Sequence, residues 1–250
     1  MATVATADLI TFLDDLLQPS EFDDYGPNGL QVPGREHVET VVTGVSAGSE
    51  LFERATDAGA DLVLVHHGLL WQGPPRPLDR PAKRRLQLLF DADIALAAYH
   101  LPLDAHLEHG NNALLAAAIG ATVTGPLAGI GVSAAFPAPI SAAVLRDRVR
   151  SACDGREPLT VSGGPDSVAT IGIVSGGGQG YLGEAIAAGL DAFVTGEASE
   201  RNFNEAREAG IHFLSAGHYA TETFGVRRLG ELLHDAFGVR HTFVDVPNPI

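Results

Sequence analysis

The sequence predicts an α/β protein built from two related lobes that arose by internal duplication. Apolar runs of strand length alternate with segments whose apolar residues recur at helical spacing. One order of elements, strand, small-residue turn, helix, Gly-x-Asp and strand, occurs twice, over 41–67 and over 168–197. Polar side chains able to bind metal follow several of these strands. We therefore expect two halves, 1–124 and 125–250, facing each other across a cleft that holds a metal site.

Composition narrows the class of protein. The 250 residues are 45% hydrophobic and 19% charged, an ordinary globular balance. The net charge of −15 argues against a surface for nucleic-acid phosphates, although the acid excess could also reflect only the salt of the source cell. The single cysteine, Cys153, excludes an intramolecular disulfide framework and a thiolate-rich zinc site. No apolar run approaches the roughly 20 residues of a membrane span, and no leader pattern opens the chain. We expect a soluble, cytoplasmic protein that does not associate with membranes.

The first half carries the clearer pattern of elements. An amphipathic helix with Thr6 available as its cap should end at Pro19. The turn-rich segment 25–32 is expected to be a loop. Gly59 and Gly120 should end two of the helices. The other expected elements are strands over 40–46, 61–65 and 94–98 and helices over 7–17, 49–58, 81–90 and 111–119.

The second half begins with a stretch rich in Pro, Gly and Ala and then repeats the opening pattern. A helix capped by Ser141 is expected to run to Arg150. Gly176 to Gly178 predict a tight turn rather than a phosphate cradle, since the segment has no lysine and no GxGxxG spacing. The remaining expected elements are strands over 130–136, 158–161, 168–174, 191–195 and 211–214, a helix over 181–188, and helices that begin near residues 198 and 218.

Three groups of imidazoles and carboxylates follow predicted strands. His66 and His67 end one strand, His100 and Asp104 follow another, and a third group comprises His218 and Glu222. The last two are four residues apart near a helix start, so their side chains should share one face. Taken singly, each group also has an ordinary structural explanation. Histidine pairs commonly pack or lie on the surface, i, i+4 pairs are commonly solvated, and Asp104 could cap the following helix.

Taken together, the three groups predict a metal site. Imidazole and carboxylate without thiolate suit zinc, iron, manganese, cobalt or nickel rather than copper(I) or an iron–sulfur cluster. Two ions about 3.5 to 4 Å apart need a bridging oxygen ligand, which a carboxylate supplies and an imidazole cannot. We assign Glu222 as the bridge.

Five segments then resemble a known family, in order and along nearly the full chain: 66–71 (HHGLLW), 99–106 (YHLPLDAH), 110–112 (GNN), 195–200 (TGEASE) and 216–222 (AGHYATE). They are similar to the NIF-three-like dinuclear metal-centre proteins, also named homologues of GTP cyclohydrolase I type 2. The resemblance implies two divalent ions per chain and a homo-hexamer. It also implies which residues are ligands: His67 and Asp104 for one ion, His66 and His218 for the other, and Glu222 for both.

Two further residues are catalytic candidates. His100 could face the metals or the substrate, or could simply make a structural hydrogen bond. Glu197 follows the repeat of the strand that ends at His66, so it could line the site, or it could cap the helix beginning near Ala198. The function predicted from these features is metal-dependent hydrolysis of a nucleotide-like or phosphorylated small molecule, with GTP cyclohydrolase action as the version that the family label suggests. The alternative is a non-catalytic metal carrier, store or scaffold.

Overall fold

The structure is a computed structural model that describes residues 3–73 and 77–250. The chain forms two compact units. Unit 1 comprises Met1–Leu103 and Gly225–Val246, and unit 2 comprises Asp104–Phe224 and Pro247–Ile250. The chain therefore leaves unit 1 within one short helix, α4 (Leu101–Ala105), and returns to it at the start of α10 (Thr223–Phe237). The two α/β halves predicted from the sequence, 1–124 and 125–250, remain a prediction.

Unit 1 is built on a five-stranded sheet with the order β13-β4-β5-β6-β2. The first four strands in that order are parallel, and β2 pairs antiparallel with β6 at the edge. A separate two-stranded ribbon joins β1 to β3. The strands of the sheet and the ribbon are β1 (Val4–Ala5), β2 (Gly29–Val32), β3 (His37–Val38), β4 (Thr40–Ser46), β5 (Leu62–His67), β6 (Ala95–Ala98) and β13 (Arg240–Phe243).

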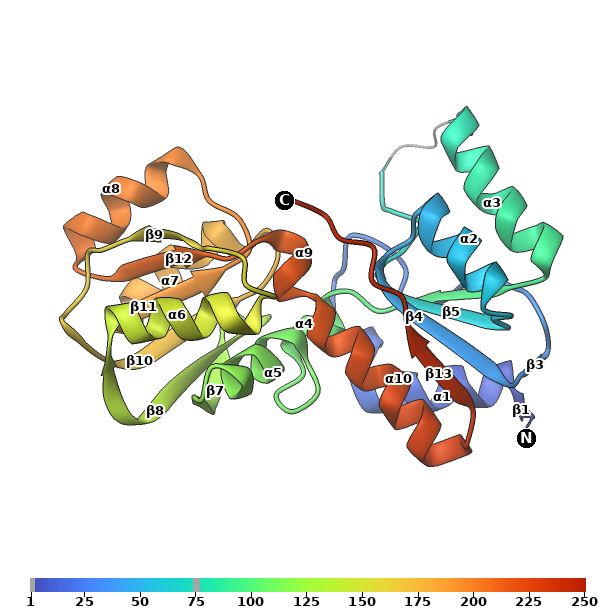
Figure 1. The fold of residues 1–250 in the computed structure, drawn as a ribbon, viewed down its shortest axis with the longest axis horizontal. Helices are drawn as coiled ribbons and strands as arrows, with labels where there is room; N and C mark the ends of the chain where they lie inside the picture. The colour runs from blue at the N-terminus through green and yellow to red at the C-terminus, as the bar shows by residue number, and fades with distance from the viewer. Residues whose placement is uncertain (1–2, 74–76) are drawn as a thin grey trace. The chain divides into compact units, whose positions relative to one another are not determined.

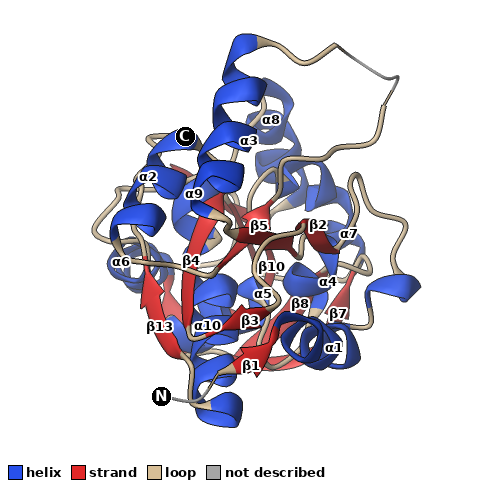
Figure 2. Cartoon of the chain, turned by 90° about the vertical axis from the view of Figure 1, so that its right-hand side faces the viewer, coloured by secondary structure: helices blue, strands red, loops and turns tan. Residues whose placement is uncertain are grey.

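Helices cover both faces of this sheet because its strands are apolar on both sides. On one face, Val63 and Val65 of β5 share a core cluster with Phe52 of α2 (Ser49–Asp57) and Leu89 of α3 (Arg80–Ala92). The alternate residues of β5 are equally buried and point to the opposite face. Figure 2 shows α1 (Thr6–Leu17) and α10 on that face. A 3-10 turn, η1 (Pro19–Glu21), follows α1.

Unit 2 is built on a six-stranded mixed sheet with the order β7-β8-β10-β11-β12-β9. Its centre, β10, β11 and β12, is parallel, whereas β7, β8 and β9 pair antiparallel with their neighbours. The bounds are β7 (Thr122–Leu127), β8 (Gly131–Ser141), β9 (Leu159–Val161), β10 (Ser167–Val174), β11 (Ala192–Thr195) and β12 (His212–Ser215).

Unit 2 also buries both faces of its sheet. Ile173 of β10 and Leu214 of β12 share a core cluster with residues of α5 (Asn111–Ala118) and α6 (Ala142–Ala152). Val174 and Phe213, one residue away in each strand, pack instead with α7 (Leu182–Ala187) and α8 (Glu200–Ala209). Figure 1 shows α6 running along this sheet. The unit also holds η2 (Gly178–Tyr181) and α9 (His218–Thr221).

The duplicated segments have the same local structure. Asp61 accepts hydrogen bonds from the backbone amides of Glu39 and Thr40 at the start of β4, with distances of 2.9 and 3.0 Å. Asp191 does the same with residues 169 and 170 in β10, at 2.8 and 2.9 Å. Gly59 and Gly189 each lie two residues before their aspartate and have φ angles of +67° and +68°. The two copies of Gly-x-Asp thus end a helix and tie the next strand to its neighbour.

Several element predictions were wrong in informative ways. Residues 29–32 form the edge strand β2 rather than a loop, and the sequence analysis missed β1, β3, β7 and β13. The strand expected over 61–65 continues to His67, so both histidines belong to β5. Thr6 does not cap α1, because its hydroxyl donates to the Arg35 carbonyl at 2.6 Å. The predicted cap by Ser141 is confirmed, since its hydroxyl accepts from the Val144 amide. Among the described residues, no helix has the length and hydropathy that crossing a membrane requires.

Candidate metal centre and catalytic groups

Three imidazoles of unit 1 gather at the carboxyl ends of neighbouring parallel strands. His66 and His67 end β5, and His100 follows β6, which pairs with β5. One nitrogen from each ring lies within 4.8 Å of the others, a spacing that could hold a metal ion. The ring centroids of His66 and His100 are 5.0 Å apart. The sequence prediction that these residues follow strand ends and lie together is correct for this trio.

His66 has its proton placed by the backbone. Its side chain is fully buried, and its Nδ1 lies 2.9 Å from the carbonyl oxygen of Tyr99. A carbonyl can only accept, so Nδ1 carries the hydrogen and Nε2 carries the lone pair. Metal-bound histidines in proteins usually have their second nitrogen held in this way.

His100 is held by a residue that the sequence analysis missed. Its Nδ1 lies 2.6 Å from Oδ1 of Asp24, whose side chain is only 3% exposed. The carboxylate of Asp24 also accepts from the Asn28 side chain and the Leu101 amide, at 2.8 and 2.9 Å. Burial raises the pKa of Asp24, but the hydrogen bond and charge of His100 and the other donors outweigh it and leave the pKa below its usual value. Asp24 is therefore ionised at neutral pH, and because a carboxylate can only accept, His100 donates to it from Nδ1 and leaves Nε2 as its second nitrogen.

His67 lies at the exposed side of this cluster. Its Nδ1 is 3.0 Å from the hydroxyl oxygen of Ser46, which ends the neighbouring strand β4. Its ring centroid is 6.1 Å from that of Trp71, and Trp71 is 5.3 Å from His100 with the two rings nearly perpendicular. With Nδ1 engaged, His67 also has Nε2 as its ligand atom.

Unit 2 brings its own candidates to the corresponding edge of its sheet. Glu197 follows β11, and His218 and Glu222 follow β12. Nδ1 of His218 lies 2.7 Å from the Glu197 carboxylate, and Nε2 lies 3.2 Å from that of Glu222. Burial lowers the pKa of His218, but Glu222 and then Glu197 outweigh it and raise the pKa to about 9. Glu197 does not cap α8, because Ser199 makes that cap.

A glycine turn makes room for the Glu222 carboxylate. Gly176 follows β10 with φ +56°, and a Cβ built there would overlap Oε1 of Glu222 and come within 3.0 Å of Nε2 of His218. The Gly176 amide donates to the Thr221 hydroxyl at 3.0 Å, and its carbonyl accepts from the amides of Gly196 and Glu197. The segment is therefore a turn, as the sequence predicted, and it packs against the two candidate ligands.

Asp104 occupies a buried polar pocket in unit 2 and does not act as a helix cap. Its Oδ1 accepts from the Asn111 amide group at 2.9 Å and from the Ser175 hydroxyl at 3.1 Å. Asn112 donates to the Asp104 backbone carbonyl and accepts from the Ser175 amide. Two donors thus fix one carboxylate oxygen and orient the other.

The donor set fits a divalent cation. In unit 1 the three imidazoles have Nδ1 engaged by a carbonyl, a hydroxyl or a carboxylate, which leaves Nε2 as the candidate ligand atom of each. In unit 2 the Glu197 carboxylate engages Nδ1 of His218 in the same way. At neutral pH a proton lies between His218 and Glu222, and a divalent cation would take its place. The candidate ligand atoms are nitrogen and oxygen, the donors that the sequence analysis expected for zinc, iron, manganese, cobalt or nickel.

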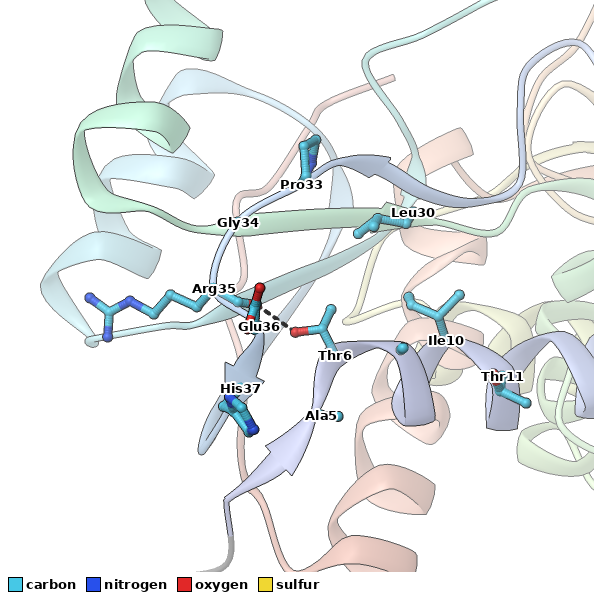
Figure 3. Close-up of a pocket in the computed structure, with 11 residues that line it drawn as sticks. Ala5, Thr6, Ile10, Thr11, Leu30, Pro33, Gly34, Arg35, Glu36 and His37 are labelled. Carbon is cyan, nitrogen blue, oxygen red and sulfur yellow. Dashed lines mark hydrogen bonds between the residues drawn. The ribbon is translucent and has the colours of Figure 1, made fainter.

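A separate pocket in unit 1 has different chemistry. It encloses about 600 Å³ between α1 and the segment from Leu30 to His37, as Figure 3 shows. Its lining includes Ile10, Leu30 and Pro33, and the Arg35 guanidinium at its rim pairs with Asp61 at 3.0 Å. The metal-ligand candidates are not among the residues that line it.

Proteins of one known family share the sequence and the architecture of this chain. A sequence model described as Duf34/NIF3 (NGG1p interacting factor 3) matches residues 4–249. The chain belongs to the Duf34/NIF3 family. The resemblance drawn from the sequence motifs is thereby confirmed.

Relatives of known sequence extend over nearly the whole chain. A protein of Pseudomonas aeruginosa named "GTP cyclohydrolase 1 type 2 homolog" is 45% identical over 98% of this chain and 99% of its own length. The protein of that name from Escherichia coli K12 is 43% identical, with 97% and 98% covered.

Solved structures agree with the fold. A structural-genomics protein called ybgI, described as of unknown function, superposes with a TM-score of 0.95 at 41% identity, covering 99% of this chain and all of the other. The protein TTHA1606 from Thermus thermophilus superposes with a TM-score of 0.92 at 40% identity, with the same coverage.

Proposed function

We propose that this chain binds two divalent metal ions through His66, His67, Asp104, His218 and Glu222 and uses them to hydrolyse a nucleotide-like or phosphorylated small molecule. The observation that carries the proposal is the convergence of His66, His67 and His100 at the end of β5 and β6, with ligand atoms within 4.8 Å. The second support is the His218–Glu222 pair in unit 2, with its partner carboxylate Glu197. GTP cyclohydrolase action is the form of this proposal that the relatives' names suggest.

When bound, such ions lower the pKa of a water molecule and polarise a carbonyl or phosphoryl oxygen. The protein's own side chains would accept and donate the proton that the reaction transfers. His100 has an ionised carboxylate behind Nδ1, so its neutral form can accept a proton at Nε2 and hold the resulting charge next to Asp24. Glu197, the second catalytic candidate, would orient His218 through Nδ1.

Turnover by purified protein is the direct test of hydrolysis. Wild-type protein loaded with zinc, manganese, iron, cobalt or nickel should release product steadily from at least one member of a panel of nucleotides and phosphoesters. His218→Ala should abolish that turnover, and added metal should not restore it. Asp191→Asn, which alters a partly buried carboxylate that accepts from the Ala169 and Thr170 amides and the Thr170 hydroxyl, should retain the activity of whatever fraction is folded.

The opposite outcome identifies a different function. If no substrate is turned over, and the bound metal exchanges readily and passes to another protein, the chain is a metal carrier or scaffold. A homo-hexamer in the cytoplasm belongs to the same proposal, and light scattering of the purified protein tests the assembly.

A further inference from the structure

Three large apolar side chains are exposed beside the imidazoles of unit 1. Tyr25 is 63% exposed, Leu70 47% and Trp71 48%. The Tyr25 ring lies 6.0 Å from that of His100, and the Trp71 ring lies 5.3 Å from His100 and 6.1 Å from His67. Exposed aromatic rings next to a polar site are typical of ligand-binding surfaces.

The two loops that carry these side chains are fastened to each other. The backbone amide of Gln72 donates to the Tyr25 carbonyl and its side chain donates to the Asp24 carbonyl, both at 2.5 Å. Gly26 packs so closely on the Leu70 carbonyl that a Cβ there would collide with it.

A second glutamine adds to this connection. The side-chain oxygen of Gln31 accepts from the amides of Leu69 and Leu70 at 2.8 and 3.2 Å, and its nitrogen donates to the Pro27 carbonyl at 2.8 Å. The two loops that carry Tyr25 and Trp71 are therefore fastened to each other by several hydrogen bonds, so binding a flat ligand would need little reordering of the backbone.

The dimensions of the patch favour a small ligand. A stable protein interface buries on the order of 1,200 Å² or more in total, which is far more than three partly exposed side chains provide. A planar heterocycle, in contrast, can stack on one indole or phenol face and still present its edge to a neighbouring polar group. His67 and His100 are such neighbours here.

We propose that Tyr25 and Trp71 form an aromatic shelf that binds the planar heteroaromatic ring of the substrate and brings its edge to His100. The inference rests on the proposed function and narrows it, because it specifies a ring such as a nucleobase as the part that is recognised. It also gives Trp71 a role in specificity that none of the metal-ligand candidates can perform.

The test uses guanosine and adenosine as probes, with ribose as the probe that lacks the ring. Trp71 is the chain's one tryptophan, so fluorescence excited at its red edge reports this position alone. Both nucleosides should quench it saturably, and ribose should not. By calorimetry, Trp71→Phe, which keeps a flat ring, should bind within a few-fold of wild type. Trp71→Leu and Tyr25→Leu should each weaken binding by roughly tenfold or more.

A matched control separates the shelf from exposed aromatic residues in general. Phe90 on α3 is 61% exposed, and Phe90→Leu should leave nucleoside binding and metal content unchanged. Absence of nucleoside binding in wild type would overturn the shelf, as would equal affinities of Trp71→Leu and Trp71→Phe. A change in oligomeric state in Trp71→Leu without loss of nucleoside binding would do the same and would identify the patch as a protein interface.

The proposed function fails by a different result. If Trp71→Leu loses nucleoside binding while wild-type protein turns over no substrate, the result supports the aromatic shelf and refutes the proposed hydrolysis. If Trp71→Leu turns over ring-containing substrates at wild-type kcat/KM, the result supports the proposed hydrolysis and refutes the aromatic shelf.

Discussion

Replacing Gly176 by alanine should damage metal binding far more than it damages folding. Gly176 has φ +56°, and its missing side chain leaves the space that Oε1 of Glu222 occupies. Glu222 is only 3% exposed, so its carboxylate has little room to move aside. The change therefore adds two effects: a backbone cost and a displaced ligand.

The two effects have different sizes. An L-residue in the left-handed region costs about 1–2 kcal/mol, which corresponds to a fall in Tm of roughly 2–8 °C for a chain of this length. To restore a normal carbon–oxygen contact, the carboxylate of Glu222 must shift by about an ångström or more. Displacements of that kind around metal ligands lower affinity roughly 10- to 100-fold.

Gly189→Ala is the matched control. Gly189 has φ +68° with no atom near the site where a Cβ would be added, so only the backbone cost applies. Both variants should lose stability in thermal unfolding of metal-free protein, and Gly176→Ala should lose more because it must also displace the Glu222 carboxylate. In calorimetric titrations with zinc or manganese, only Gly176→Ala should show the weakened affinity. Equal metal affinities for the two variants would refute the placement of Glu222 as a ligand behind this turn.

Three other perturbations have defined outcomes. In Asp24→Asn, an amide replaces the carboxylate that now accepts hydrogen bonds from the Asn28 side chain and the Leu101 amide. We expect the free energy of unfolding, measured in urea at pH 7, to fall by about 1–3 kcal/mol. Because the pKa of Asp24 is lowered in the folded state, its stabilisation is present above pH about 4 and is lost in more acidic solution; the wild-type advantage over Asp24→Asn should therefore shrink there. Cys153 is buried, and burial followed by the charge of Asp154 raises its pKa to about 12, so iodoacetamide should label it only on unfolding. The thiol of the unfolded chain ionises near pH 8.5, so the free energy of unfolding should fall as the pH rises above that value. Cys153→Ala should make this fall less steep, and an unchanged dependence on pH would contradict the burial of Cys153. Asp61→Asn and Asp191→Asn should each cost about 1–3 kcal/mol in unfolding, and a neutral result at either would break the equivalence of the duplicated segments.

The strand ends were the most predictable part of this site. Apolar runs of four to eight residues give the parallel strands, and residues that follow such strands lie at one edge of a sheet. His66, His67 and His100 gather for that reason in unit 1, as do Glu197 and His218 in unit 2.

Other parts depend on contacts that a local pattern does not contain. Asp24 lies 76 residues from His100 in the chain and sits in a turn-rich segment that gives no periodic signal. The edge strand β2 has an irregular register with β6 and follows Gly-Pro-Asn, so it resembles a loop. Glu222 was expected within one helix with His218. It instead lies at a break between α9 and α10, although the pair still meets at 3.2 Å.

Elemental analysis of purified protein beside its Glu222→Ala variant tests the central claim most directly. We predict about two divalent ions per chain in the wild type and a collapse of that stoichiometry in the variant, with Gly189→Ala retaining the wild-type value. A metal content that is negligible in wild type, or unchanged by Glu222→Ala, would contradict the assignment of this chain as a dinuclear metal protein.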